Sequence, residues 1–114
     1  MKADWHYELS GARQHYVLEA MVERAVGGRA YGWFQADSRF VLEKIEVTAA
    51  LRSKGYGTLL IDELRSKARE MGCTGLVIQG VRAGNRRAIK LYESLGAVAQ
   101  PATDGLCDFV FSPP

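Results

Sequence analysis

The chain has 114 residues and a formal net charge of +2; 47% of its residues are hydrophobic and 25% are charged. This length and composition fit one globular domain and exclude disordered, collagen-like and disulfide-knotted chains. No apolar run approaches the roughly 18–20 residues of a membrane-spanning helix, and the small net charge gives no reason to expect nucleic-acid binding. The two cysteines lack metal-type spacing, and the first eight residues lack an apolar signal core. We therefore expect a cytoplasmic protein with no metal and no membrane association.

The first 47 residues are rich in aromatic side chains, which favour strands. Strand candidates lie at residues 5–9, 15–26, 29–36 and 40–47. Turn signals stand between them at Ser10-Gly11, Gly27-Gly28 and Asp37-Ser38. Because the connections are short, this half predicts an antiparallel meander. The alternative of a helix over residues 17–24 stays open.

Beyond residue 48, helix and strand alternate. Leu60, Leu64 and Ala68 recur at helical spacing and predict a helix over about residues 55–71. The apolar run at residues 76–78 is typical of a buried strand.

Asn85 is a good capping residue for a second helix. The inner face of that helix carries Ala88, Leu91, Tyr92 and Leu95. Gly96 stands where the helix should end, and Pro101 and Gly105 separate two last strands at residues 97–99 and 107–111.

These elements predict an α/β (α+β) fold in a single domain over residues 1–114. Its core is a mixed, mostly antiparallel sheet of about six to seven strands with two main helices. Residues 1–47 supply the aromatic-rich strands, residues 48–97 a helix–strand–helix segment, and residues 98–114 the last strands.

A glycine turn after the fourth strand is the most informative segment. Gly55 and Gly57 remove side chains where a ligand would approach the backbone. The following helix start offers unpaired N–H groups, and Arg52 and Lys54 add positive charge, so the segment suits a diphosphate. An ordinary turn with basic surface residues is the alternative. Neither a Walker loop nor a complete dinucleotide fingerprint is present.

Two segments resemble the GCN5-related N-acetyltransferase (GNAT) family. Residues 52–57, Arg-Ser-Lys-Gly-Tyr-Gly, are similar to its acyl-CoA diphosphate loop, Arg/Gln-x-x-Gly-x-Gly/Ala. Residues 85–97 are similar to its second motif, Asn-x-x-Ala-x-x-Leu-Tyr-x-x-x-Gly-Phe, with Ala97 in place of the final aromatic residue. The lead-in at residues 81–85 also resembles ribosomal-protein N-terminal acetyltransferases. The usual pair of helices between the first two strands of the family is missing here, which leaves the acceptor pocket open or completed by a second subunit.

The resemblance implies transfer of an acetyl group from the co-substrate acetyl-CoA to a primary amine of a peptide or small molecule, by direct attack in a ternary complex. It implies that the backbone of the fourth strand and the loop bind acetyl-CoA, with Asn85 of the second helix. The implied binding residues are Ile45, Val47, Arg52, Ser53, Lys54, Gly55, Tyr56, Gly57, Thr58 and Asn85.

The resemblance also implies that Tyr92 protonates the departing thiolate. A base must accept the amine proton, and Glu46 and Glu43 on the fourth strand are the candidates. Strand alternation places these two carboxylates on opposite faces unless a bulge intervenes. We favour Glu46, which lies beside the expected thioester, with Glu43 or a water chain as the alternatives.

Two other functions stay open: a non-catalytic acyl-CoA-binding or sensing module, and a protein-interaction domain. The aromatic half could also form a homodimer interface, which is compatible with catalysis.

Overall fold

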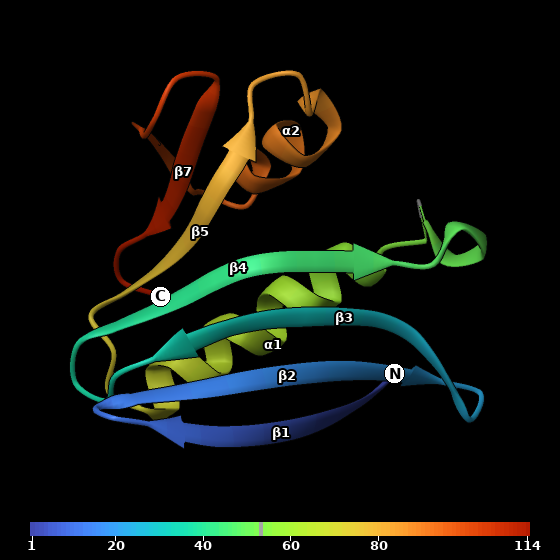
Figure 1. Cartoon of the computed structure of the whole chain (residues 1–114). Helices are drawn as coiled ribbons and strands as arrows, with labels where there is room; N and C mark the ends of the chain where they lie inside the picture. Colours follow the sequence, from blue (N-terminus) through green and yellow to red (C-terminus); the bar gives the residue numbers. More distant parts are fainter. Residues whose placement is uncertain (53) are drawn as a thin grey trace.

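The computed structural model describes residues 1–52 and 54–114 and shows one seven-stranded sheet with two α-helices on it (Figure 1). The strands are β1 Lys2–Ser10, β2 Arg13–Val22, β3 Ala25–Phe34, β4 Arg39–Val47, β5 Gly75–Arg82, β6 Val98–Pro101 and β7 Leu106–Phe111. The helices are η1 Ala49–Leu51, a 3-10 turn, then α1 Tyr56–Glu70 and α2 Arg86–Ser94. The order in the sheet is β1-β2-β3-β4-β5-β7-β6. The predicted mixed sheet is confirmed, and β1 passes directly into β2 with no helix between them.

The N-terminal half is the predicted antiparallel meander, β1 to β4. Residues 17–22 belong to β2, so the strand prediction is confirmed over the helix. The prediction that Gly27-Gly28 ends the second strand is wrong: the turn lies at Glu23 and Arg24, both with positive φ, and the two glycines lie within β3.

Close packing explains these glycines. A Cβ on Gly27 would collide with the Leu51 side chain, and a Cβ on Gly28 would lie 2.9 Å from the Glu46 carbonyl oxygen. Glycine inside a strand often marks such a close approach. The two glycines are therefore required here by close packing and not by a turn.

Helix α1 covers one face of the meander, where strand and helix side chains form the core. Its apolar positions Leu60, Ile61, Leu64 and Ala68 are all fully buried. On the sheet side, Tyr16, Phe34 and Phe40 pack as an aromatic cluster, with the Phe34 and Phe40 rings stacked 5.1 Å apart. The helical periodicity that predicted α1 therefore also identified its buried face.

The C-terminal segment continues the sheet through β5 and β7 to the short edge strand β6. Strand β5 is longer than predicted, and Pro101, expected between the last two strands, is the final residue of β6. Neither described helix has the length and apolarity needed to cross a bilayer.

Candidate active site

The site lies where β4 and β5 separate. These strands pair in parallel only from Arg39↔Gly75 to Leu42↔Ile78, although both continue further. Beyond that point Figure 1 shows β5 turning away from β4, with α2 beside β5. Because β4 has no strand partner on this side after Leu42 among the described residues, its last backbone groups face the gap.

A bulge on each strand accompanies the separation. Gly32 of β3 pairs with Leu42 and Tyr31 with Lys44, so Glu43 is an extra residue on β4. A Cβ on Gly32 would collide with the Val41 carbonyl oxygen, and the buried Tyr16 hydroxyl donates a hydrogen bond of 2.8 Å to that oxygen. The bulge is thus fixed by glycine on one strand and tyrosine on another.

The bulge on β5 lies at Gln79-Gly80, opposite Asp108 of β7. Gly80 has φ +70°, a conformation that favours glycine. Its N–H donates a hydrogen bond of 2.8 Å to Asp108 Oδ1. Both strands therefore bend at the same level of the sheet, which opens the space between them.

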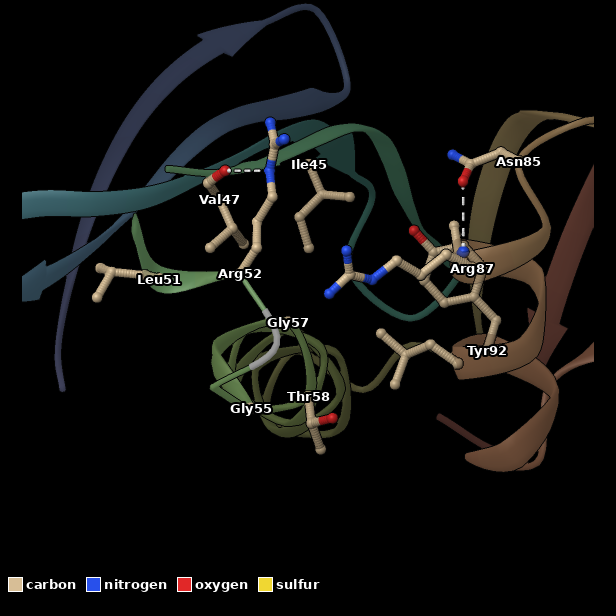
Figure 2. A pocket seen from close by; sticks show the side chains of 12 residues that line it. Ile45, Val47, Leu51, Arg52, Gly55, Gly57, Thr58, Asn85, Arg87 and Tyr92 are labelled. Atoms are coloured by element: carbon tan, nitrogen blue, oxygen red, sulfur yellow. Dashed lines mark hydrogen bonds between the residues drawn. The ribbon is translucent and has the colours of Figure 1, made fainter. Parts of the chain in front are cut away.

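A cavity of about 430 Å³ occupies this opening, between the end of β4, the start of α1 and α2 (Figure 2). Eight residues expected at the site line it: Ile45, Val47, Arg52, Gly55, Gly57, Thr58, Asn85 and Tyr92. Lys54 and Tyr56 are not among the lining residues, and Ser53 lies outside the described residues. Segments far apart in the sequence thus meet at one cavity.

The start of α1 gives the cavity its capacity to bind an anion. The N-cap is Gly55 with φ +83°, which provides no side-chain cap, and the first turn carries no acidic residue. Among the described residues, no side chain accepts a hydrogen bond from the first N–H groups of the helix, so they can serve an anion beside the positive end of the helix dipole. A Cβ on Gly57 would lie 3.4 Å from Leu91 Cδ2, so the glycine keeps the passage between α1 and α2 open.

Two polar side chains border the cavity from opposite sides. Arg52 folds back so that its Nε donates a hydrogen bond of 3.2 Å to the Val47 carbonyl oxygen. Asn85 caps α2, as predicted: its Oδ1 accepts a hydrogen bond of 3.3 Å from the Ala88 N–H (Figure 2). The cap fixes the Asn85 side chain at the mouth of the cavity.

Tyr92, on α2, is a buried residue of the cavity lining. It is 4% exposed, and its ring centre is 5.7 Å from that of Phe109. Burial raises the pKa of the Tyr92 hydroxyl above the ordinary 10.0, so the phenol holds its proton at neutral pH. Tyr92 also lines a second hollow of about 360 Å³ between β4 and β5, and it therefore stands between the two spaces.

The two candidate carboxylates lie in different surroundings, and neither lines the first cavity. Glu43 lines the second hollow, together with Tyr92 and the β5 bulge. Glu46 lines a third hollow of about 300 Å³ next to Arg29 and Arg52, and its Oε1 lies 2.9 Å from Lys44 Nζ.

Sequence reasoning left four of the lining residues out of the predicted binding set: Leu51, Arg87, Ala88 and Leu91. The helical period of the sequence places Ala88 and Leu91 on the inner face of the second helix. The available signal was their position one turn after Asn85 and next to Tyr92, because a helix that lines a cleft shows the same apolar period as one that packs on a core.

Comparisons with known proteins agree with this geometry. The model of the acetyltransferase (GNAT) family matches residues 1–97. A GNAT family acetyltransferase from Elizabethkingia anophelis with acetyl-CoA bound superposes with a TM-score of 0.75 at 12% identity, over 96% of this chain and 97% of that one. A Bacillus subtilis acetyltransferase in complex with CoA gives a TM-score of 0.73 at 16% identity, over 86% and 76% of the two chains.

The ribosomal-protein-S18-alanine N-acetyltransferase from Escherichia coli has higher sequence identity, 25%, with a TM-score of 0.69 over 90% of this chain and 68% of that one. No curated protein sequence gives a significant match.

Proposed function

Because the chain belongs to the GNAT family of acetyltransferases, we propose that it transfers an acetyl group from acetyl-CoA to a primary amine of a peptide or small molecule, by direct attack in a ternary complex. One observation carries the proposal. The start of α1, which has no side-chain cap among the described residues, opens on a cavity that the buried Tyr92 also lines, and burial keeps the Tyr92 hydroxyl protonated at neutral pH, with its pKa raised. An anion-binding end and a proton donor thus share one space.

In this proposal the diphosphate of acetyl-CoA binds at the first N–H groups of α1, where Gly55 and Gly57 leave room. The amides of the pantetheine arm pair with the free backbone side of Ile45 and Val47, as an added strand would. A backbone N–H near Val47 polarises the thioester carbonyl. Lys54 and Tyr56 would contribute through their backbone.

The chemistry then takes place near Tyr92. The amine nitrogen attacks the carbonyl carbon, the carbon–sulfur bond breaks, and the amide forms. The Tyr92 hydroxyl gives its proton to the thiolate, because a phenol can protonate a basic sulfur. The amine loses one proton to a base, and the products are the acetylated amine and free CoA.

We assign the base role to Glu43 rather than Glu46. Glu43 shares its hollow with Tyr92, whereas Glu46 pairs with Lys44 beside a different hollow. If so, Glu43→Gln lowers kcat strongly and Glu46→Gln leaves it within about twofold, with acetyl-CoA binding retained in both. Loss of turnover only in Glu46→Gln would reverse the assignment.

The experiment for the whole proposal measures free thiol released from acetyl-CoA in the presence of a panel of peptide and small-molecule amines. With an accepted amine, Tyr92→Phe should lower kcat about 100-fold, the low end of what general acids contribute, while acetyl-CoA binding is unchanged. Tyr31→Phe is the matched control, because Tyr31 lines none of the described hollows. Equal kcat in the wild type and Tyr92→Phe would remove the proton-donor role.

A non-catalytic acyl-CoA-binding module is the second candidate. The direct β1–β2 connection favours it, because the family usually places two helices there to wall the acceptor pocket. This candidate predicts acetyl-CoA binding without thiol release for every amine in the panel.

A further inference from the structure

Strand β1 is the longer of the two edge strands of the sheet, and it carries neither a proline nor a bulge. The opposite edge strand, β6, has only four residues and ends in Pro101, both of which discourage pairing with another chain. Strand β1 has nine residues, no proline, and an unbroken register with β2. Tyr7 and Leu9 on it are 47% and 70% exposed. Its outer row of backbone N–H and C=O groups has no strand partner among the described residues.

The two faces of β1 differ in chemistry. Ala3 and Trp5 pack against the core beside α1, and the Trp5 Nε1 donates a hydrogen bond of 3.3 Å to Glu63 of that helix. The alternate residues, Lys2, Asp4, His6 and Glu8, carry charged or titratable groups on the uncovered face.

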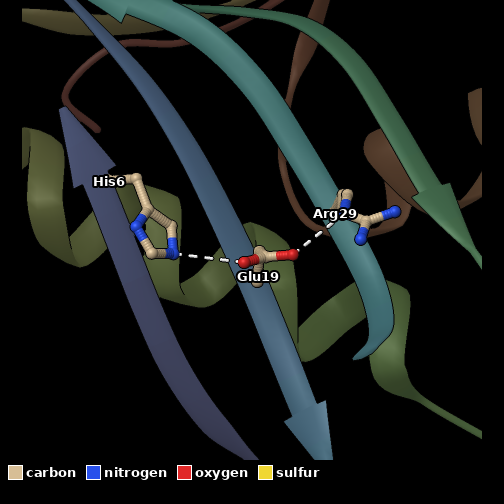
Figure 3. Close-up of polar contacts among 3 residues, drawn as sticks. All are labelled: His6, Glu19 and Arg29. Carbon is tan, nitrogen blue, oxygen red and sulfur yellow. Dashed lines mark hydrogen bonds and ion pairs between the residues drawn. The ribbon is translucent and has the colours of Figure 1, made fainter. Parts of the chain in front are cut away.

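Figure 3 shows the uncovered face near His6. The His6 Nε2 lies 3.1 Å from Glu19 Oε1, and the Arg29 Nε lies 3.0 Å from Glu19 Oε2. On β1 itself, His6 is therefore engaged with Glu19. Lys2 and Glu8 form no ion pair among the described residues and remain available for a strand added at the edge.

The charge order along β1 is self-complementary. In an antiparallel pair of identical strands related by a two-fold axis, the register is set by the residue that faces its own copy. With Trp5 at the axis, Lys2 faces Glu8 and Asp4 faces His6, each twice by symmetry. On the other face, the small Ala3 is opposite the large Tyr7.

Every other register loses the two Lys2–Glu8 pairs. With Asp4 at the axis, two aspartates oppose each other. With His6 at the axis, Asp4 faces Glu8 twice, and like charges directly opposite are destabilising. With Tyr7 at the axis, Lys2 falls outside the pairing.

We infer that β1 pairs with β1 of a second copy of this chain, antiparallel and centred on Trp5, so that one sheet runs through both protomers. The cavity beside α1 and α2 opens at β4 and β5, away from this edge. Dimerisation is therefore independent of the proposed acetyl-CoA site, and either can fail without the other.

The test is sedimentation velocity from about 1 µM to about 1 mM, the affinity range expected for an interface below standard size. Wild type should dimerise. Lys2→Glu or Glu8→Lys should each weaken dimerisation roughly tenfold, because each replaces two attractive pairs with two repulsive ones. The double variant Lys2→Glu/Glu8→Lys should restore the wild-type constant.

Both side chains are exposed, so folding should be unchanged, and thermal unfolding of each variant checks this. Wild type that stays monomeric over the whole range overturns the inference. So do single variants that dimerise like wild type, or a double variant that is not rescued. A dimer whose register is centred on Tyr7 would give a double variant that is not rescued. In that register Glu8 faces His6, and Lys2 has no partner on the second strand.

Discussion

Replacing Gly57 with tryptophan should block the α1 start while keeping the helix intact. Gly57 is the second residue of α1 and lines the cavity, and even a Cβ there would lie 3.4 Å from Leu91. An indole at this position has to extend into the passage between α1 and α2. Tryptophan is also a better helix former than glycine by roughly 0.5 kcal/mol, so the helix itself should not weaken.

The expected loss follows from the hydrogen bonds displaced. A hydrogen bond to a charged group contributes about 1.5–3 kcal/mol. If the indole displaces the diphosphate from two N–H groups of the first turn, binding weakens by about 3–6 kcal/mol, which is roughly 100-fold to 10⁴-fold in Kd.

Equilibrium dialysis with acetyl-CoA measures this loss. Leu59→Trp is the matched control, since Leu59 lies two residues later on α1, is 44% exposed, and lines none of the described hollows. That variant should bind like wild type. A folded Gly57→Trp protein with undiminished affinity would refute the placement of the diphosphate.

Two further predictions concern stability. Gly32→Ala should lower the free energy of unfolding, measured in urea, by about 2–3 kcal/mol, because the added Cβ collides with the Val41 carbonyl oxygen at the β4 bulge. Gly84→Ala is the control: open space surrounds Gly84, so this variant should be nearly neutral. Equal losses of stability in the two variants would argue against the packing described at the bulge. Burial raises the pKa of Tyr16 and Tyr92 above 10.0 in the folded chain. The unfolded chain therefore loses these protons first, so stability is full below pH 10.0 and falls as pH rises above it. Tyr16→Phe should flatten that fall, and an unchanged slope would contradict the assignment.

Local patterns predicted most of the fold. The apolar period of residues 60, 64 and 68 located α1 and its buried face, and the cap at Asn85 located the start of α2. The glycine pair in β3 led to a wrong turn prediction, because the need for glycine there comes from residues distant in the sequence. The Leu51 side chain and the Glu46 carbonyl oxygen approach the two glycines from other segments. A single sequence shows that a glycine is present and leaves open whether a turn or a neighbour requires it.

The candidate site was likewise predictable only in part. The loop glycines and Asn85 were predictable because short motifs carry them, and the structure brings them to one cavity. The surroundings of Glu43 and Glu46 were not predictable, because they depend on a bulge that Gly32 and Tyr16 fix from two other strands. Strand alternation alone predicts that the two carboxylates face opposite sides unless a bulge intervenes, and it does not identify the hollow that each carboxylate lines.

Acetyl-CoA binding in the cavity at the start of α1 is measured by calorimetric titration of the wild-type protein, with CoA for comparison and with ATP and NAD as phosphate-bearing controls. We expect acetyl-CoA and CoA to bind in the micromolar range, with no comparable binding of ATP or NAD. A folded protein that binds neither acetyl-CoA nor CoA would contradict both the enzyme and the acyl-CoA-binding module.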